Sequence, residues 1–197
     1  MTFIETVPED EATAAVEEMY EAVRGSYGHV TNFAAAFSLR PEVLGAWMKL
    51  NGAIKANMDL RRYELATLAA ARRLRSSYCA LAHGTVLADE CLRPGEELEA
   101  IASDHRTAGL DAADVAVMDF AERVVDDASS ITQADVEHLR ELGLSDAEVF
   151  DVALAAAARC FFSKTLDALG VQPDGKFSAR DPGLREALVV GRPIAEA

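Results

Sequence analysis

A cysteine and a histidine stand four residues apart in the stretch SSYCALAH, residues 76–83. Positions four apart lie on one face of an α-helix, so Cys79 and His83 could act on the same bound molecule. A cysteine near a helix N-terminus ionises more readily, and an imidazole within reach can take its proton. Glu64, on the preceding predicted helix, could hold the imidazole ring and stabilise its protonated form. Together these three residues could supply the nucleophile, the base and the orienting acid of an activated thiol.

Two other interpretations of these residues stay open. A cysteine on an alanine-rich helix is usually a small buried hydrophobe, and a histidine four residues away is often a partly buried structural residue. Cys79, His83 and Glu64 could also supply three metal ligands. The sequence has no second C-x-x-C or H-x-x-x-H pattern to complete a zinc site, so we expect neither a metal nor a cofactor.

Start and stop signals divide the chain into helix-sized pieces and predict an all-α protein. Pro41 suits a first helical turn, Asp59 an N-cap, Ser145 with Glu148 a capping box, and Gly170 a C-cap. The helices predicted in this way cover residues 9–24, 32–39, 41–56, 60–74, 76–90, 111–127 and 146–169, with further starts at Pro94 and Thr132 and a short apolar tail segment at 184–190.

Composition and charge limit the classes of partner. Half of the 197 residues are hydrophobic, and the net charge of −14 would repel a phosphate backbone, so we expect no nucleic-acid binding. No apolar run is long enough to cross a bilayer, and the acidic N-terminus does not resemble a secretory signal. Three cysteines at irregular spacing form no disulfide framework. We therefore expect a cytoplasmic protein without membrane contact.

The stretch ELATLAAARRLRSSYCALAHGTVL resembles the signature of the AhpD-like superfamily, which includes alkylhydroperoxidases and carboxymuconolactone decarboxylases. That signature is a glutamate, eleven residues, then C-x-x-C-x-x-x-H, and here eleven residues separate Glu64 from Ser76. Three further segments resemble the peroxidase-related subgroup: YGHVTNFAAAFSLRPEVLGAW, ITQADVEHLRELGLSDAEVFDVALAAA and CFFSKTLDALGVQPD. The likeness covers roughly residues 5–175.

The resemblance implies an AhpD-like helical bundle with an N-terminal helical extension, assembled as a homo-oligomer. Residues 1–58 would pack on a core of residues 59–175, and residues 176–197 would form a tail. It also implies a thiol-peroxidase site for a small peroxide substrate. Cys79 would be its reactive thiol, and His83 and Glu64 would form its proton relay.

The chain departs from the family pattern at Ser76, which replaces the first cysteine of C-x-x-C. A serine cannot form a disulfide, but it can donate a hydrogen bond to a thiolate or sulfenate and can cap the helix. Cys91 lies too far along a continuous helix to replace the lost thiol, and Cys160 stands in a core-like stretch. An external thiol or dithiol reductant is therefore expected.

Three functions follow from this pattern. The first is thiol-dependent reduction of alkyl hydroperoxides through Cys79. The second is a decarboxylase-like or isomerase-like reaction on a small cyclic acid, which would need Arg61, Arg72 or Arg73 in the pocket to attract an anion. The third is a non-catalytic oligomeric module that binds an apolar ligand or partner, or senses oxidants through Cys79.

Overall fold

Helices make up all the regular structure in the part of the chain that the structure describes. The structure is a computed structural model and describes residues 2–196. The predicted all-α class is confirmed. The α-helices are α1 (Ala14–Tyr27), α2 (Asn32–Ala36), α3 (Pro41–Ala56), α4 (Leu60–Arg73), α5 (Ser77–Val86), α6 (Leu98–Asp104), α7 (Ala112–Asp127), α8 (Gln133–Glu141), α9 (Asp146–Ala168) and α10 (Pro182–Leu188). A π-helical turn (Leu87–Cys91) continues α5.

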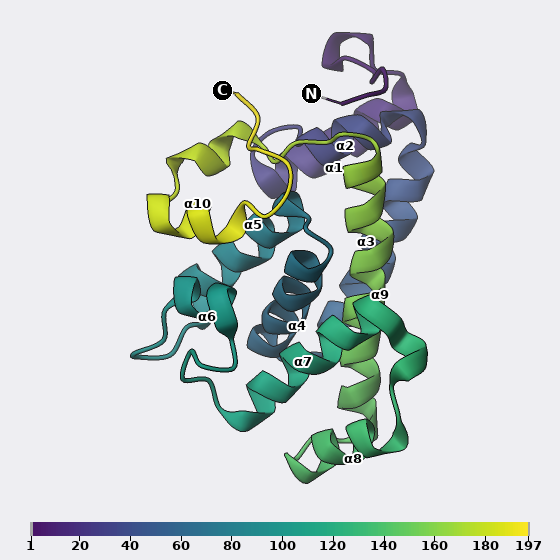
Figure 1. The fold of residues 1–197 in the computed structure, drawn as a ribbon. Coiled ribbons are helices and arrows are strands. Elements are labelled where there is room, and N and C mark those ends of the chain that lie inside the picture. Colours follow the sequence, from purple (N-terminus) through teal and green to yellow (C-terminus); the bar gives the residue numbers. More distant parts are fainter. Residues whose placement is uncertain (1, 197) are drawn as a thin grey trace.

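Helix α4 lies at the centre of the bundle, in contact with α5, α7 and α9 (Figure 1). Every residue from Tyr63 to Ala71 is buried. A helix surrounded on all sides needs small side chains where its neighbours approach closely, and the alanines at 66 and 69–71 supply them. The same central position carries the charged side chain of Glu64 into the interior.

The N-terminal helices pack on α9 through aromatic rings. Helix α3 contacts both α1 and α9. Phe162 of α9 stacks on Trp47 and on Phe37, with ring centroids 5.0 Å and 5.9 Å apart, and Phe33 meets the same ring edge-on. Aromatic pairs of this geometry contribute about 0.5–1.5 kcal/mol each beyond the area they bury. The predicted division of the chain at residues 58 and 175 stays a prediction.

Several predicted helix ends are confirmed by their capping contacts. The Asp59 side chain accepts a hydrogen bond from the amide of Arg62 at the start of α4. Ser145 and Glu148 form a complete capping box at the start of α9, and Thr132 and Asp135 form one before α8. These contacts satisfy amide groups that a helix N-terminus leaves without an intrahelical partner.

Two predicted helix starts are wrong. The first helix begins at Ala14 instead of residue 9, because a 3-10 turn and an extended residue, Thr13, precede it. The helix expected to begin at Pro94 begins four residues later, at Leu98, because Pro94 and Gly95 belong to a turn in which Gly95 has a φ of 87°.

The C-terminal segment docks on the body of the same chain. Helix α10 contacts α5 and α6 (Figure 1). Leu188 packs against Gly84, where an added Cβ would come within 2.6 Å of the leucine side chain. The amide of Gly191 donates to Ser77 Oγ at 2.7 Å, at the first turn of α5. The tail therefore fixes both the start and the middle of the helix that carries Cys79.

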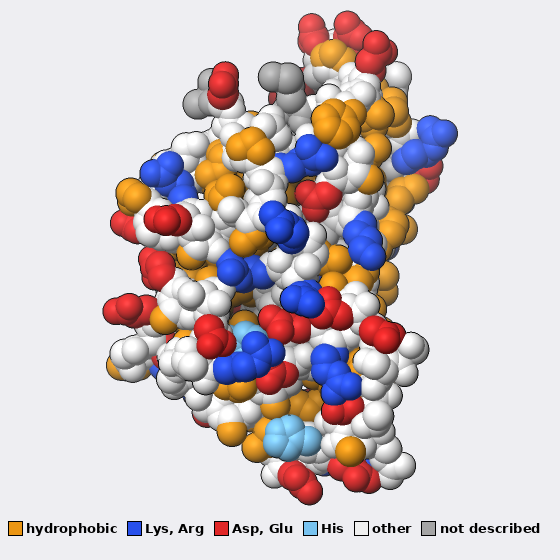
Figure 2. Space-filling model, viewed as in Figure 1, with side chains coloured by type: hydrophobic (Ala, Val, Ile, Leu, Met, Phe, Trp, Pro, Cys, Tyr) orange, Lys and Arg blue, Asp and Glu red, His pale blue; other side chains and the backbone are white. Residues whose placement is uncertain are grey.

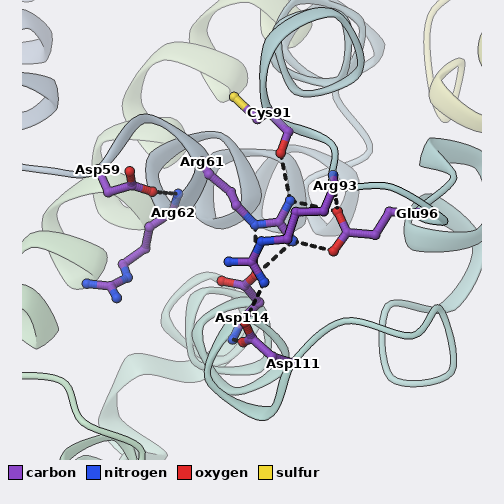
Figure 3. A network of polar contacts seen from close by, with 8 residues as sticks. All are labelled: Asp59, Arg61, Arg62, Cys91, Arg93, Glu96, Asp111 and Asp114. Atoms are coloured by element: carbon purple, nitrogen blue, oxygen red, sulfur yellow. Dashed lines mark hydrogen bonds and ion pairs between the residues drawn. The ribbon is translucent and has the colours of Figure 1, made fainter.

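A buried arginine joins the starts of α4 and α7 to the turn after α5. Arg61 is 8% exposed, and its Nε donates to Asp114 at 2.8 Å. Its terminal nitrogens donate to both carboxylate oxygens of Glu96 and to the carbonyl of Cys91, at 2.8–2.9 Å (Figure 3). Arg61 is fully engaged in this network. It is therefore not the anion-binding residue that the decarboxylase-like hypothesis required.

The surface mixes charges of both signs. Figure 2 shows basic and acidic side chains interspersed with apolar ones over one face of the molecule. Within residues 2–196, no helix is long and apolar enough to cross a membrane. Leu39, Val43, Leu50 and Phe161 are large apolar side chains that remain exposed. The expected homo-oligomer stays a prediction.

We predict that Arg61→Met lowers the free energy of unfolding by about 3–5 kcal/mol, because it removes the cation that contacts the buried Asp114 carboxylate at 2.8 Å. Arg140→Met is the matched control, since among the described residues Arg140 forms an ion pair only with Asp146, at the surface, and should change stability little. Urea denaturation followed by circular dichroism measures both variants. Equal effects of the two substitutions would contradict a structural role specific to the buried arginine.

Candidate active site

A cavity of about 570 Å³ lies between α3, α5 and α9. Residues from the segment before α3 and from the segment after α9 also border it. Cys79 and His83 of α5, Asn51 and Trp47 of α3, and Arg159 of α9 line it. The structure therefore brings two of the predicted site residues, Cys79 and His83, to one cavity. Glu64 lies behind His83, and Ser76 is not part of the lining.

A tight turn places α5 against α4. Arg75 adopts a left-handed conformation with φ of 58°, which turns the chain sharply after α4. Ser76 follows as the N-cap residue, and Cys79 lies in the first turn of α5. Because α5 folds back along α4, His83 comes within hydrogen-bond distance of a residue nineteen positions earlier.

Glu64 holds the imidazole of His83 from behind. His83 Nδ1 lies 2.7 Å from Glu64 Oε2, and the glutamate side chain is 1% exposed. A carboxylate accepts hydrogen bonds only, so Nδ1 carries the proton and donates it. Lys55 Nζ lies 3.5 Å from the other carboxylate oxygen. The buried charge of Glu64 is thus balanced, and the ring is fixed in one tautomer.

Arg159 forms a hydrogen bond with the other ring nitrogen of His83. Its Nη1 lies 2.9 Å from His83 Nε2, and its Nη2 donates to Asn51 Oδ1 at 2.7 Å. Arginine has no acceptor, so Nε2 must accept, which agrees with a proton on Nδ1. The Tyr63 hydroxyl donates to the same Asn51 oxygen at 2.8 Å. A polar layer therefore links α3, α4, α5 and α9 beneath the cavity.

Burial lowers the pKa of His83 from its ordinary value. Glu64 opposes this effect through its hydrogen bond and its charge, whereas the positive charges of Arg159 and Lys55 lower the pKa further. A lowered pKa means a neutral imidazole at neutral pH. The ring is thus in the form that can accept a proton.

Cys79 is buried but borders the cavity. Its residue is 1% exposed, and its thiol is free. Between residues 2 and 196, no side chain forms a hydrogen bond with this sulfur. It stands one helical turn before His83, so a bound molecule between the two would touch both.

Ser76 takes the N-cap position of α5, but its side chain makes no capping hydrogen bond. The predicted cap is therefore right in position and wrong in the hydroxyl contact. Its Oγ is fully buried and has no hydrogen bond of normal geometry in the described part of the chain. Burial raises the pKa of Asp167, and the Ser76 hydroxyl counters part of that rise, so the two side chains face each other.

Comparison with known proteins gives a fold. No protein-family model and no curated protein matches the sequence. The crystal structure of an AhpD core, an uncharacterised peroxidase-related protein from Ralstonia eutropha JMP134, superposes with a TM-score of 0.79 at 21% identity, over 89% of this chain and 94% of that one. An uncharacterised peroxidase-related protein from Silicibacter sp. TM1040 gives 0.76 at 22% identity, over 91% and 95%.

The chain has the AhpD-like fold. The resemblance found in the sequence is thereby confirmed at the level of fold. The debrominase Bmp8, as its C82A variant in complex with 2,3,4-tribromopyrrole, shares this architecture with a TM-score of 0.72 at 13% identity, over 94% of this chain and 95% of that one. The AhpD-like bundle thus occurs both in uncharacterised peroxidase-related proteins and in a debrominase.

The other two cysteines of this AhpD-like chain lie outside the cavity lining. Cys91 and Cys160 are partly buried, and no disulfide joins the cysteines. Burial raises the pKa of Cys91, so its thiol is less ionised than an exposed one. The carbonyl of Cys91 instead serves the Arg61 network. Neither residue replaces the thiol that the family pattern has at position 76.

Sequence reasoning missed Arg159, the residue that completes the polar layer. Of the three arginines proposed as anion anchors, Arg61, Arg72 and Arg73, none lines the cavity. Arg159 lies in the apolar stretch AAAARCFF, which reads as core. The one charged residue in this apolar stretch could have indicated a functional residue, because a charge that is buried needs a specific partner.

One cluster of metal-type side chains lies elsewhere, at His105, Asp119 and Glu122. His105 Nε2 already lies 2.8 Å from Asp119, and Arg106 pairs with both acids. These contacts satisfy the cluster as an ion-pair network. It has no connection with the cavity that Cys79 lines.

We predict that His83 titrates below 6.5, the ordinary histidine value, in NMR spectra of histidine-labelled protein. Glu64→Gln should lower the value further, since it removes the charge that raises the pKa. The unfolded chain binds a proton more tightly, so the stability due to the neutral ring is complete above about pH 6.5 and falls as the pH drops toward the folded pKa. A value at or above 6.5 would contradict the assigned environment.

Proposed function

We propose that this protein is a thiol-dependent peroxidase that reduces small organic hydroperoxides at Cys79. One observation carries the proposal. Cys79 borders the same cavity as His83, whose ring a buried glutamate fixes in a single neutral tautomer. A thiol next to a neutral, oriented imidazole has the components of an activated nucleophile. The AhpD-like fold of the peroxidase-related proteins supports the same assignment.

In the proposed reaction the Cys79 thiolate attacks the terminal oxygen of the hydroperoxide. An S–O bond forms and the O–O bond breaks, which leaves a sulfenic acid on Cys79 and an alkoxide. The alkoxide takes the proton that His83 removed from the thiol, so an alcohol leaves. Two electrons pass from sulfur to oxygen in this step.

Proton transfer to His83 requires a rearrangement in the polar layer. Both ring nitrogens already have partners, Glu64 at Nδ1 and Arg159 at Nε2. Nε2 is the nitrogen that carries no proton, so it must separate from Arg159 before it can act as the base. Catalytic hydrogen bonds of this kind often form only once the substrate is bound.

A second thiol must return Cys79 to its reduced form. In the proposed cycle an external thiol attacks the sulfenic acid, releasing water and forming a mixed disulfide. Another external thiol then releases Cys79 as the thiol and leaves as a disulfide. Ser76 lies three residues before Cys79, and we propose that its buried hydroxyl turns from Asp167 to donate a hydrogen bond to the oxidised sulfur.

We predict that Cys79→Ser abolishes the reduction of cumene hydroperoxide by dithiothreitol, and that His83→Gln lowers its rate 10²- to 10⁴-fold. Cys160→Ser is the matched control and should retain activity, because that thiol lies outside the cavity. Loss of peroxide is measured with a ferrous colorimetric assay. A sulfenic-acid probe that fails to mark Cys79 after one equivalent of peroxide would instead support a non-catalytic binding module.

We further predict that Ser76→Cys forms an intramolecular disulfide with Cys79 on oxidation, since the two positions are those of the family's cysteine pair. Intact-mass analysis should then show a loss of two hydrogens, whereas the parent chain shows the addition of one oxygen. If the parent chain also loses two hydrogens, another cysteine serves as the resolving thiol.

The decarboxylase-like alternative uses the same residues differently. His83 and Glu64 would act as acid and base on a small cyclic acid, and Cys79 would be incidental. Cys79→Ser separates the two hypotheses, because it should preserve such a reaction and abolish peroxide reduction.

A second candidate, reductive dehalogenation of a small aromatic ring, is favoured by the aromatic walls of the cavity beside Cys79. Bmp8, which shares the fold, is a debrominase crystallised with 2,3,4-tribromopyrrole. Two external thiols would supply two electrons, so that C–Br becomes C–H, bromide and a proton leave, and a disulfide forms. Release of bromide from 2,3,4-tribromopyrrole in the presence of dithiothreitol, measured by ion chromatography, tests this candidate.

A further inference from the structure

The guanidinium of Arg159 is a buried charge that no carboxylate balances directly. The residue is 4% exposed, and none of the described acidic side chains lies within ion-pair distance of it. Its hydrogen-bond partners, His83 Nε2 and Asn51 Oδ1, are neutral. Buried charges in proteins are normally paired because removing an ion from water costs several kcal/mol. The absence of a paired acid therefore calls for an explanation.

The nearby acids are already engaged by other groups. Glu64 binds His83 and lies 3.5 Å from Lys55. Asp174, which also borders the cavity, accepts hydrogen bonds from the Tyr78 hydroxyl and from the amide of Asn32. In the polar layer one carboxylate, Glu64, thus faces the cations of Lys55 and Arg159. One further negative charge would balance the layer.

Arg159 has hydrogen-bond donors that none of the described residues uses. A guanidinium has five N–H donors, and the polar layer uses two of them. Arg159 Nε is buried and has no partner among the residues described, and the same is true of Thr85 Oγ1, which also borders the cavity. A guanidinium edge of this kind matches the two oxygens of a carboxylate.

The walls of the same cavity are aromatic. Arg159 lies over the Trp47 ring, with 4.9 Å between the guanidinium carbon and the ring centroid. Phe33, Phe162 and Tyr78 complete this wall, with Phe33 in edge contact with each of the other two rings. Flat aromatic walls favour a flat aromatic ligand, through offset-stacked and edge contacts.

We propose that the cavity binds a small aromatic carboxylate, with its carboxylate on Arg159 and its ring between the aromatic walls. The proposal rests on the proposed function only in placing this ligand beside Cys79, and it implies a hydroperoxide substrate that also carries an aromatic carboxylate. A carboxylate that draws Arg159 toward itself also releases His83 Nε2, the nitrogen that the reaction needs. Binding of the acid thus favours release of the base, whereas a hydroperoxide without a carboxylate needs a separate movement of Arg159.

Benzoate and benzamide are the test pair, because they share a ring and differ in charge. Isothermal titration calorimetry without peroxide should give a dissociation constant at least 10-fold lower for benzoate than for benzamide. Trp47 is the only tryptophan of the chain, so a change in its fluorescence on excitation at 295 nm places the ligand at this wall. Acetate, which lacks the ring, should bind at least 10-fold more weakly than benzoate.

Arg159→Met should weaken benzoate binding at least 10-fold and leave benzamide binding unchanged. Lys176→Gln is the control of equal charge change. Lys176 also borders the cavity but is exposed, so its loss should change benzoate affinity less than threefold. Circular dichroism confirms that each variant is folded.

Benzoate that binds no more tightly than benzamide to the unmodified protein would overturn the proposal, whatever the variants do. Equal losses of affinity in Arg159→Met and Lys176→Gln would also overturn it, since they would indicate general electrostatic attraction. Because binding is measured without turnover, an inactive peroxidase that binds benzoate would refute the proposed function and leave the ligand class supported.

Discussion

The hydrogen bond between His83 and Glu64 crosses from α5 to the central helix α4, and the cavity chemistry depends on it. A carboxylate buried to this extent is tolerated only with partners, and His83 and Lys55 provide them. The bond sets the tautomer of the ring and aligns α5 along α4. The tail reinforces this alignment, because Leu188 packs on Gly84 one residue beyond the histidine.

Arg159 turns this pair into a layer that spans four helices. It joins His83 on α5 to Asn51 on α3, and Tyr63 on α4 donates to the same asparagine. The stacked rings of Trp47 and Phe162 lie against the Arg159 guanidinium of this layer. A buried polar network is stable only when its donors and acceptors form hydrogen bonds. The donors of Arg159 that have no partner among the described residues therefore favour binding of a ligand that can accept from them.

A single thiol in the cavity has consequences for the whole reaction. With Ser76 in place of a second cysteine, the proposed oxidation of Cys79 would end as a sulfenic acid that needs an external thiol. Cys91 and Cys160 lie outside the cavity lining and do not change this requirement. The protein as proposed therefore couples peroxide removal to whichever thiol can enter the cavity.

Local sequence patterns were sufficient for the helical class and for the helix ends where a capping side chain lies within three residues of its partner, as at Asp59 and Ser145. They also gave the spacing of Glu64, Cys79 and His83. The wrong starts at residue 9 and Pro94 fell where turn residues compete with weak helix signals.

Arg159, Asn51 and the orientation of the Ser76 hydroxyl were decided by the tertiary structure alone. Arg159 meets His83 across 76 residues of sequence. Helical periodicity tells which residues share a face, but it does not tell which other helix that face will meet. That information lies in the packing of the whole bundle, where burial determines which partners a charge must find.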